Sequence, residues 1–455
     1  MKLGVVILAA GQGTRMRSAR PKVLHLLAGT PLLGHVIGAA KSCGADRIAV
    51  VYGHGGGHVQ EALADSELTW VEQAQQLGTG HAVIQAMPAM AAMDKVLVLY
   101  GDVPLIRPET LNSLLQSGSE SPLSLLTVEL PDPAGYGRIV RDSTAGIQRI
   151  VEQKDASPQE LLITEINTGI LVAQRDRLEG WLAKLSNENA QGEYYLTDIV
   201  AMAVAEGEQV LSAQPADIHE VVGVNDRVQL AELERCFQSL RAQELMRQGV
   251  TLRDPARFDL RGRLSVGRDV EIDINVLIEG DVTIGDNVRI GANTVIRNSR
   301  IGDGVQIFEN CVIEDADVGG ESKIGPFSRL RPDTVLAEQV HIGNFVELKK
   351  TRVDQGSKIN HLSYVGDSIV GKRVNIGAGT ITCNYDGANK FQTVFSDDVF
   401  IGSDTQLVAP VEIGAGATVG AGTTVTRDVP PHALALSRVK QSHVMNWERP
   451  KKKPK

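Results

Sequence analysis

The second half of the chain carries an aliphatic residue at every sixth position, from Val266 to Val425. A period of six matches neither an α-helix, which repeats every ~3.6 residues, nor a single strand, which repeats every ~2. It predicts a parallel β-helix, in which each six-residue unit forms one strand and one corner. We expect the aliphatic side chain to point into the coil and a small residue directly after it, usually Gly or Asp, to permit the corner. The unbroken runs are Val266, Ile272, Ile278, Ile284, Ile290 and Ile296; Ile324, Leu330, Leu336, Ile342 and Leu348; and Ile401, Leu407, Ile413, Val419 and Val425.

The first half of the chain alternates short aliphatic runs with helical patterns. Such alternation predicts βαβ units, so we expect a Rossmann-like α/β domain with a mostly parallel sheet covered on both faces. The predicted strands are Leu3–Ala10, Arg47–Gly53, Lys95–Tyr100, Leu123–Leu130 and Gly169–Val172.

A long helical pattern lies between the two halves. Leu233, Phe237, Leu240 and Leu245 recur at helix-like spacing, and Gly249 is a plausible stop. We therefore expect four parts: an α/β domain over 1–227, a connecting helix over 228–249, a β-helix over 250–437 and a tail over 438–455.

Composition and charge narrow the possible partners. A formal net charge of −9 argues against a nucleic-acid surface. No apolar run approaches the ~20 residues of a membrane span, so we expect no membrane insertion. The four cysteines are far apart and lack C-x-x-C spacing, which argues against a zinc site or a disulfide framework and suits a cytoplasmic protein. They are Cys43, Cys236, Cys311 and Cys383.

A glycine-rich loop follows the first predicted strand. The stretch Leu8–Met16 reads LAAGQGTRM, and Pro21-Lys22 follows. Glycines let the backbone approach a phosphate closely, and a following helix N-terminus offers free N–H groups. Arg15 and Lys22 add cations for a triphosphate. A glycine turn without a ligand is the alternative, and the pattern is neither a Walker A loop nor a dinucleotide fingerprint.

A carboxylate ends another buried strand, in the sequence Tyr100-Gly101-Asp102. Ligands bind at the carboxyl ends of strands in open parallel sheets. Asp102 could hold Mg²⁺ beside substrate phosphates, because this ion usually takes one or two protein carboxylates. Taken alone, a strand-end Asp is more often a cap.

The glycine-rich loop with its downstream Pro-Lys resembles the signature of the sugar-phosphate nucleotidylyltransferases, and other segments resemble the uridylyltransferase branch. The resemblance implies that UTP contacts include Leu8, Ala9, Ala10 and Gly11. It also implies a second metal contact at Asn225, which would otherwise be read as a helix cap. Uracil recognition falls on Gln73, Gly78 and Thr79, and contacts to the sugar of N-acetylglucosamine 1-phosphate fall on Gly137, Glu152 and Asn167.

The back half departs from its repeat in one place, the excursion Thr382–Val399. A long loop in so regular a scaffold is usually functional. Before it, Arg331 and Lys349 are three hexads apart, so we expect them to stack on successive coils, where two cations suit a phosphate monoester. His361 could be a general base near neutral pH. The alternatives are a solvated basic stripe and a structural histidine.

The back half resembles the hexapeptide-repeat acetyltransferases. The stretch from His361 to Lys390 is similar to the acetyltransferase domain of the bifunctional N-acetylglucosamine-1-phosphate uridylyltransferase / glucosamine-1-phosphate N-acetyltransferase family. The resemblance implies a left-handed β-helix and a homotrimer with acetyl-transfer sites between neighbouring subunits. It assigns proton removal to His361, the sugar phosphate to Arg331 and Lys349, and the sugar to Tyr364 and Asn375. Further contacts to acetyl-CoA or the sugar fall on Ala378, Asn384, Tyr385, Ser403, Ala421 and Arg438.

Together these features predict a bifunctional, Mg²⁺-dependent enzyme. It would make UDP-N-acetylglucosamine from glucosamine 1-phosphate, acetyl-CoA and UTP, as a precursor for peptidoglycan and, where present, lipopolysaccharide. One alternative is a sugar-phosphate nucleotidylyltransferase whose β-helix only oligomerises or regulates. Another is a scaffold with a degenerate front domain, against which the intact LAAGQGTRM and Asp102 argue.

Overall fold

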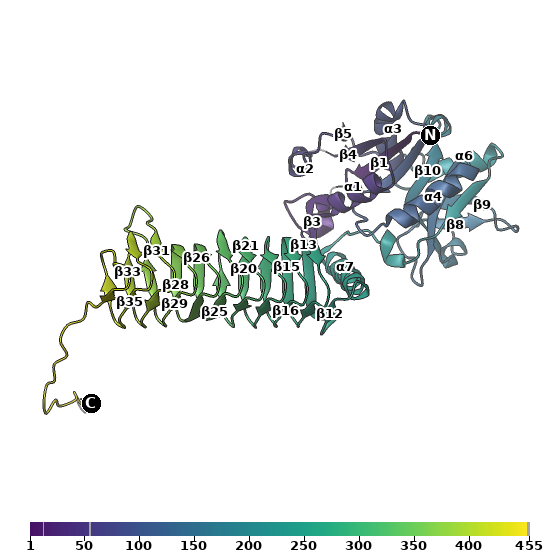
Figure 1. The fold of residues 1–455 in the computed structure, drawn as a ribbon. Helices are drawn as coiled ribbons and strands as arrows, with labels where there is room; N and C mark the ends of the chain where they lie inside the picture. The colour runs from purple at the N-terminus through teal and green to yellow at the C-terminus, as the bar shows by residue number, and fades with distance from the viewer. Residues whose placement is uncertain (12, 54–55, 453–455) are drawn as a thin grey trace. The chain divides into compact units, whose positions relative to one another are not determined.

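The chain divides into two compact units, Met1–Phe237 and Gln238–Lys455 (Figure 1). The computed structural model describes residues 1–11, 13–53 and 56–452. Gln12, within the glycine-rich loop, lies outside the described residues.

The first unit is built on a mixed sheet in the order β11-β7-β10-β6-β1-β4-β5, which β8 and β9 extend. All five predicted strands are present, as β1, β4, β6, β7 and β10. The sheet is mostly parallel, as expected, but β10 runs antiparallel to both β6 and β7. Its strands are β1 Leu3–Ala9, β4 Arg47–Tyr52, β5 Leu68–Glu72, β6 Lys95–Tyr100, β7 Leu123–Glu129, β8 Arg138–Arg141, β9 Ile147–Val151, β10 Glu165–Gln174 and β11 Val210–Ala213.

Helices cover both faces of this sheet because successive side chains of β1 point to opposite sides. Val5 and Ile7 pack in one core with Val36 of α1, whereas Val6 and Leu8 pack in the other core with α3. Among the described residues, no helix is long and apolar enough to cross a membrane. The helices are α1 Leu32–Ser42, α2 Gly57–Ala62, α3 Thr79–Ala86, α4 Pro108–Glu120, α5 Arg175–Leu182, α6 Asp198–Ala205 and α7 Arg227–Arg247. Short pieces are η1 Thr14–Met16, η2 Lys22–Leu24, η3 Met87–Met90, η4 Glu160–Leu162, η5 Ile218–Val221, η6 Pro255–Arg257, and the pair β2 Leu26–Leu27 and β3 Thr30–Pro31.

The connecting helix expected over 228–249 is α7, and it is not a free-standing connector. The boundary between the two units falls inside it, at Phe237 and Gln238. Leu233 packs in a core of the first unit, whereas Ala242 and Leu245 pack in the core of the second. Each half of α7 is therefore part of a different unit.

The second unit is a parallel β-helix whose strands stack coil upon coil (Figure 1). One face is an eleven-stranded sheet in the described part of the chain. Its strands are β12 Thr251–Leu252, β14 Glu271–Ile272, β16 Arg289–Ile290, β19 Gln306–Ile307, β22 Lys323–Ile324, β25 His341–Asn344, β27 Lys358–His361, β29 Asn375–Ile376, β32 Phe400–Ile401, β35 Thr418–Val419 and β37 Leu434–Ala435.

The other strands form a fifteen-stranded sheet within the described residues. Long strands connect two columns of shorter strands within this sheet. For example, the first half of β15 pairs with β17, and the end of β15 pairs with β18. The strands are β13 Phe258–Val266, β15 Val276–Ile284, β17 Val295–Arg297, β18 Arg300–Ile301, β20 Val312–Glu314, β21 Ala316–Val318, β23 Arg329–Leu330, β24 Thr334–Leu336, β26 Glu347–Val353, β28 Tyr364–Val370, β30 Ile381–Cys383, β31 Thr393–Phe395, β33 Gln406–Val408, β34 Val411–Ile413 and β36 Thr424–Val425.

The six-residue repeat places its aliphatic side chains inside the coils, as predicted. Ile290, Ile307, Ile324, Ile342 and Ile359 lie at one register on successive coils. Each is at most 2% exposed. These residues form a continuous apolar stack along the second unit.

The predicted role of the small residue after each aliphatic position was wrong. The left-handed corner residue comes three positions after the aliphatic one, as at Asn275, Asn293 and Asn310, with φ of 58–60°. The residue directly after the aliphatic is small because neighbouring coils approach closely there. A Cβ at Gly402 would lie 2.4 Å from the Ala421 nitrogen, so steric space rather than backbone conformation selects glycine.

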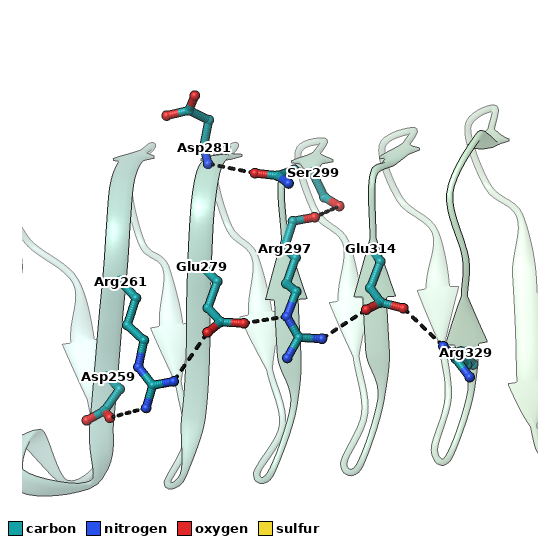
Figure 2. Close-up of polar contacts among 9 residues, drawn as sticks. Asp259, Arg261, Glu279, Asp281, Arg297, Ser299, Glu314 and Arg329 are labelled. Atoms are coloured by element: carbon teal, nitrogen blue, oxygen red, sulfur yellow. Dashed lines mark hydrogen bonds and ion pairs between the residues drawn. The ribbon is translucent and has the colours of Figure 1, made fainter. Parts of the chain in front are cut away.

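Charged side chains form a ladder across five coils of the fifteen-stranded sheet (Figure 2). Arg261, Glu279, Arg297, Glu314 and Arg329 alternate in sign, and each pairs with the next. Arg297 is at the centre of the ladder: it contacts Glu279 on the preceding coil and lies 2.9 Å from a Glu314 oxygen on the following coil. Its planar guanidinium suits this bridging role.

Replacing Arg297 with Gln should destabilise the β-helix in a salt-dependent way. The side chain is 37% exposed, so the loss should be about 1 kcal/mol or less, or about 2–4 °C in melting temperature at low salt. Calorimetry at low salt and at ~1 M salt, where charges are screened over ~3 Å, should show the difference shrink. Arg352→Gln, an exposed arginine outside the ladder, is the control. An equal loss at both salt concentrations would contradict an electrostatic ladder.

Candidate active sites

The carboxyl ends of β1 and β6 meet at one edge of the sheet of the first unit, because Leu8 pairs with Tyr100. A cavity of about 370 Å³ opens there. Ten of the predicted residues line it: Leu8, Ala9, Ala10, Gly11, Lys22, Gln73, Gly78, Thr79, Tyr100 and Asp102. The lining also includes Val23, Gln76, Ala82 and Glu193, which the sequence analysis did not select.

A lysine joins the two predicted metal contacts beside this cavity. The Lys22 ammonium contacts Asp102 Oδ2 and lies 3.4 Å from Asn225 Oδ1. The backbone holds the two oxygens close together, since the Val224 N–H donates to the Asp102 carbonyl at 2.9 Å. The Lys22 and Asp102 side chains are only 12% and 17% exposed, so these charges interact with little screening by water.

The glycine-rich loop approaches Lys22 closely. Gly13 has φ of 60°, and a Cβ there would lie 2.6 Å from the Lys22 Cβ. A Cβ at Gly11 would meet nothing within 4 Å, which leaves the cavity side of the loop open. Arg15, in η1, is exposed and is not among the cavity-lining residues.

The segment predicted to recognise uracil is held in place by its own hydrogen bonds. The buried Gln73 amide donates to the Gly78 carbonyl at 3.1 Å. Gly78 has φ of 103°, and a Cβ there would lie 2.8 Å from the Tyr194 oxygen, so no side chain fits. The Gln76 amide donates to the Ala10 carbonyl, which ties this segment to the glycine-rich loop.

The predicted sugar contacts gather around Tyr100. A Cβ at Gly169 would lie 2.5 Å from the Tyr100 ring, so the ring packs directly on that backbone. Burial raises the pKa of the Tyr100 phenol, and the charges of Glu152 and Asp102 add to the shift. Asn167 N–H donates to the Gly137 carbonyl at 2.8 Å. Gly137, Glu152 and Asn167 thus lie in one group, although none of them lines the 370 Å³ cavity.

In the β-helix, the two predicted phosphate contacts lie one coil apart. Leu330 pairs with Leu348, and the Arg331 N–H donates to the Leu348 carbonyl at 2.9 Å, which sets Arg331 beside Lys349. Arg331 is partly neutralised by Glu347, 2.8 Å away.

A third cation, Lys390, was missed by the sequence analysis. Its contact with Lys349, and then the charge of that lysine, lowers the pKa of the Lys390 amine. Lys390 is exposed and Lys349 is half-buried. Two ammonium groups held together repel each other, which suits an anion between them.

The excursion expected over Thr382–Val399 is shorter than predicted. Residues Thr393–Phe395 form β31, which pairs with β28 and belongs to the regular coil. The coil from Ile376 to Ile401 spans 25 residues, against 18 for Ile401 to Val419, so the insertion is about seven residues. A bridge between Tyr385 and Lys390 closes the loop and returns Lys390 toward Lys349.

Asn384, one of the predicted contacts to acetyl-CoA or the sugar, lies beside the predicted sugar contact Tyr364. Its buried amide donates to Asp367 Oδ2 at 2.6 Å and lies 3.5 Å from the Tyr364 hydroxyl. Gly366 makes room for the phenol, because a Cβ there would lie 2.4 Å from the Tyr364 oxygen. Tyr385 is exposed, and its hydroxyl donates to the Gly387 carbonyl.

Four other predicted residues stand in a single column at one corner. The residues that follow Ala378, Ser403 and Ala421 each donate a backbone N–H to the preceding coil. Gly379 donates to the His361 carbonyl, Asp404 to the Ala378 carbonyl and Gly422 to the Ser403 carbonyl. Ala421 therefore continues the column, which we name the His361 column. A Cβ at Gly420 would lie 3.5 Å from Arg438 Nη2, so Arg438 lies at its far end. Asn375 is outside it, on β29 between Lys358 and Phe400.

A second column, of bulky apolar residues, runs beside the His361 column at the left-handed corner position. Phe327, Phe345 and Leu362 have φ of 56°, 56° and 46°. They are 49%, 54% and 63% exposed, and the two rings stack with centroids 5.2 Å apart. Bulky residues are rare at positive φ, where Asn or Gly is usual, so both conformation and exposure are unfavourable here. We call these residues the apolar corner.

The fold and the two polar centres define a nucleotidyltransferase unit joined to a hexapeptide-repeat transferase unit. Family models match accordingly: the MobA-like NTP transferase domain over residues 5–159, the GMPPB C-terminal domain over 260–353 and the bacterial transferase hexapeptide (six repeats) over 393–427. The second unit is thus a left-handed β-helix, as expected.

Several full-length relatives share the name bifunctional protein GlmU. "Bifunctional protein GlmU" of Nitrosospira multiformis is 57% identical over 455 residues, covering 100% of this chain and 99% of that protein. The proteins of that name from Ralstonia nicotianae and Azoarcus sp. (strain BH72) are 59% identical over 453 and 448 residues. They cover 100% and 98% of this chain and 100% and 99% of their own lengths. The chain belongs to the GlmU family.

Glu152→Gln should stabilise the first unit at neutral pH. Burial raises the pKa of the Glu152 carboxyl, a hydrogen bond from Thr197 opposes this, and the charges of Asp198 and Asp155 add to it. A carboxyl with a raised folded-state pKa is destabilising once the pH exceeds its ordinary value of ~4.3. Thermal melts should show a gain at neutral pH that vanishes near pH ~4.

Glu160→Gln is the matched control with the opposite sign. Hydrogen bonds from Ser157, with Arg149 adding, lower the pKa of Glu160 to about 2. Its stabilising contribution is present above the ordinary carboxyl pKa and disappears as the pH falls toward 2. This variant should lower the melting temperature at neutral pH, and a shift of the same sign in both variants would contradict the assignment.

Proposed function

We propose that this protein performs two steps of UDP-N-acetylglucosamine synthesis at two separate sites. One site transfers acetyl from acetyl-CoA to glucosamine 1-phosphate. The other transfers uridylyl from UTP to the N-acetylglucosamine 1-phosphate formed, releasing pyrophosphate. Two observations carry the proposal. The chain is 57–59% identical to bifunctional GlmU proteins over its full length, and each unit contains one polar centre.

Uridylyl transfer takes place at the cavity of the first unit. A phosphate oxygen of the sugar 1-phosphate attacks the α-phosphorus of UTP, a new P–O bond forms, and the bond to the pyrophosphate oxygen breaks. The nucleophile is already anionic, so no general base is needed, and catalysis is positioning plus charge neutralisation. Lys22 and the open backbone of the glycine-rich loop supply that neutralisation, and Arg15, exposed in η1 outside the cavity lining, adds a further cation nearby.

The same cavity fits a magnesium ion. Asp102 and Asn225 direct their oxygens at one common cationic atom, the Lys22 ammonium, which stands where a cation is favoured. Among the described residues, no group of three His, Cys, Asp or Glu side chains could hold a metal. One carboxylate and one amide suit Mg²⁺, which completes its shell with water and phosphates. When bound, the ion would neutralise charge on the phosphates.

Substrate selection follows from the rigid segments around the cavity. Gln73, Gly78 and Thr79 present amide and backbone groups to the edge of uracil. Glu152 and Asn167 present a carboxylate and an amide to the hydroxyl and acetamido groups of the sugar. Gln76 and Glu193 also line the cavity.

Acetyl transfer takes place on the β-helix. His361 takes a proton from the 2-amino group of glucosamine 1-phosphate while the nitrogen attacks the thioester carbonyl of acetyl-CoA. A C–N bond forms, the C–S bond breaks, and the proton passes to the departing sulfur of coenzyme A. Lys349, Arg331 and Lys390 hold the sugar phosphate, with Tyr364, Asn375 and Asn384 beside the sugar.

The His361 column supplies the path of the thioester. Above His361 its side chains are small, at Ala378, Ser403 and Ala421, which leaves room for an extended chain across successive coils. Adjacent strands lie ~4.8 Å apart, so these three steps span about 14 Å. Arg438 at the far end, and the exposed Tyr385, suit the phosphates and base of coenzyme A.

A homotrimer completes the acetyl-transfer site. The apolar corner lies directly beside His361, exposed and in an unfavourable conformation, and a neighbouring β-helix packed there would bury it. Burial of apolar area contributes about 25 cal/mol per Å², which offsets the cost of the corner. The four cysteines are free thiols, which suits activity in the cytoplasm.

The alternative is a nucleotidylyltransferase whose β-helix only oligomerises. It leaves unexplained the gathering of Lys349, Lys390, Tyr364 and Asn384, because structural coils have no need of clustered like charges.

The two-site assignment predicts reciprocal losses of activity. His361→Ala should lower acetyl transfer by ~10²–10⁴-fold and leave uridylyl transfer intact, because proton removal is lost in one unit only. Asp102→Ala should abolish Mg²⁺-dependent pyrophosphate release and spare acetylation. Products from glucosamine 1-phosphate and N-acetylglucosamine 1-phosphate are identified by mass. If either variant lost both activities while remaining folded, the two-site model would fail.

The apolar corner can be tested without straining the coil. Asp occupies the same corner position at Asp333 and Asp404, with φ of 64° and 57°, so Phe345→Asp should preserve the backbone. The added charge should dissociate the trimer and reduce acetyl transfer, while uridylyl transfer persists. Sedimentation gives the oligomeric state. Gln339→Asp, at a corner elsewhere with φ of 60°, is the control and should remain trimeric. A trimeric Phe345→Asp protein would place the interface elsewhere.

A further inference from the structure

We infer that Asn344 is a positioning residue for His361: its amide oxygen accepts a hydrogen bond from the Nδ1–H and leaves Nε2 free to take the substrate proton. This inference rests on the role of His361 proposed above.

The geometry is direct. His361 Nδ1 lies 2.9 Å from Asn344 Oδ1. The two residues are paired across β25 and β27, and the Leu362 N–H donates to the Asn344 carbonyl at 3.1 Å. The backbone therefore fixes the two side chains on successive coils. His361 is exposed, so packing alone does not orient its ring.

An acceptor at Nδ1 determines which imidazole nitrogen can act as a base. A neutral imidazole carries one N–H and one lone pair, on different nitrogens. If Nδ1 donates to the amide oxygen, the lone pair must be on Nε2. Partners of this kind fix the tautomer of a functional histidine and hold its ring in place.

No conformational reason accounts for Asn at this position. Elsewhere in the β-helix, Asn275, Asn293 and Asn310 occupy the left-handed corner, where Asn is favoured. In this coil the left-handed residue is Phe345, and Asn344 precedes it on the strand. The corner does not need Asn344, whereas the imidazole does.

A neutral partner also suits the charges around His361. The groups that face this part of the sheet are His341 on β25 and Lys358 on β27. Burial lowers the pKa of His341, and the charges of Lys323, Lys358 and His361 lower it further. The charged groups that act on His341 are therefore all cationic. An amide oxygen fixes the tautomer without the strong preference for imidazolium that a carboxylate would impose.

The step served is the acetyl transfer described above. The amino nitrogen bonds to the thioester carbonyl carbon, the C–S bond breaks, and the proton moves from nitrogen to His361 Nε2 and on to the sulfur. Nδ1 keeps its proton throughout, and the Asn344 oxygen stabilises the transient imidazolium.

Two substitutions in the full-length protein separate positioning from packing. Asn344→Leu removes the acceptor and should lower kcat for acetyl transfer by ~10–100-fold with little change in KM for glucosamine 1-phosphate. Asn344→Asp keeps an acceptor and should retain activity. It should also move the acidic limb of the pH profile of kcat/KM to higher pH, because a carboxylate favours imidazolium. Gln306→Leu, an amide on a distant coil of the same sheet, is the control and should change neither activity.

Nitrogen NMR of histidine-labelled protein supplies a readout independent of activity. The His361 ring should be protonated at Nδ1 in the wild type and in Asn344→Asp, and should become a tautomer mixture in Asn344→Leu. If Asn344→Leu fails to fold or assemble, the pH shift and tautomer of Asn344→Asp still decide the matter.

His361→Ala, assayed in parallel, separates a failure of the role proposed for His361 from a failure of the role inferred for Asn344. Retained acetylation in that variant would overturn the role of His361, and the inference with it. Loss in His361→Ala combined with unchanged kcat, pH profile and tautomer in the Asn344 variants would overturn the inference alone.

Discussion

The register between successive coils is the constraint on which the second unit depends. Backbone hydrogen bonds join each residue to the residue one coil away, and the buried aliphatic stack prevents the coils from sliding. A shift of one residue would turn the apolar side chains outward and polar ones inward. With the register held, residues 17, 18 or 25 positions apart in sequence become neighbours, as His361 and Ala378 do. The proposed acetyl-transfer site depends on this pairing, since its groups come from separate coils.

The first unit also brings residues that are distant in sequence together, but it does so with an open sheet. There the parallel pairing of β1 with β6 carries two loops to one edge, and Asn225, which precedes α7, lies beside them. A glycine-rich loop lets Lys22 approach Asp102 in a poorly hydrated place, where charge is most effective. Both units therefore use a stiff sheet to fix backbone positions, and both place their cations where it ends or turns.

Local patterns predicted more than long-range ones. The period of six predicted the inward residues, and the strand-loop pattern at Leu8–Met16 predicted a loop whose first residues line a cavity, because each depends on neighbours in sequence. Gln76 and Lys390 could not be found this way. Their positions depend on a hydrogen bond to Ala10 and on a loop closed by Tyr385. The role of the small residue after each aliphatic was wrong for the same reason, since it depends on contact with the next coil. Asn344 became visible only once its pairing with His361 was known.

The long coil between Ile376 and Ile401 has an evolutionary consequence. It gains about seven residues at one corner, yet the strands on either side remain in register with their neighbours. A corner can therefore accept new sequence as a cassette, without disturbing the coils above and below. His361 and Ser403 stay two strand spacings apart, about 10 Å, whatever that cassette contains. An exchange of this loop would therefore change one corner and leave the His361 column in place.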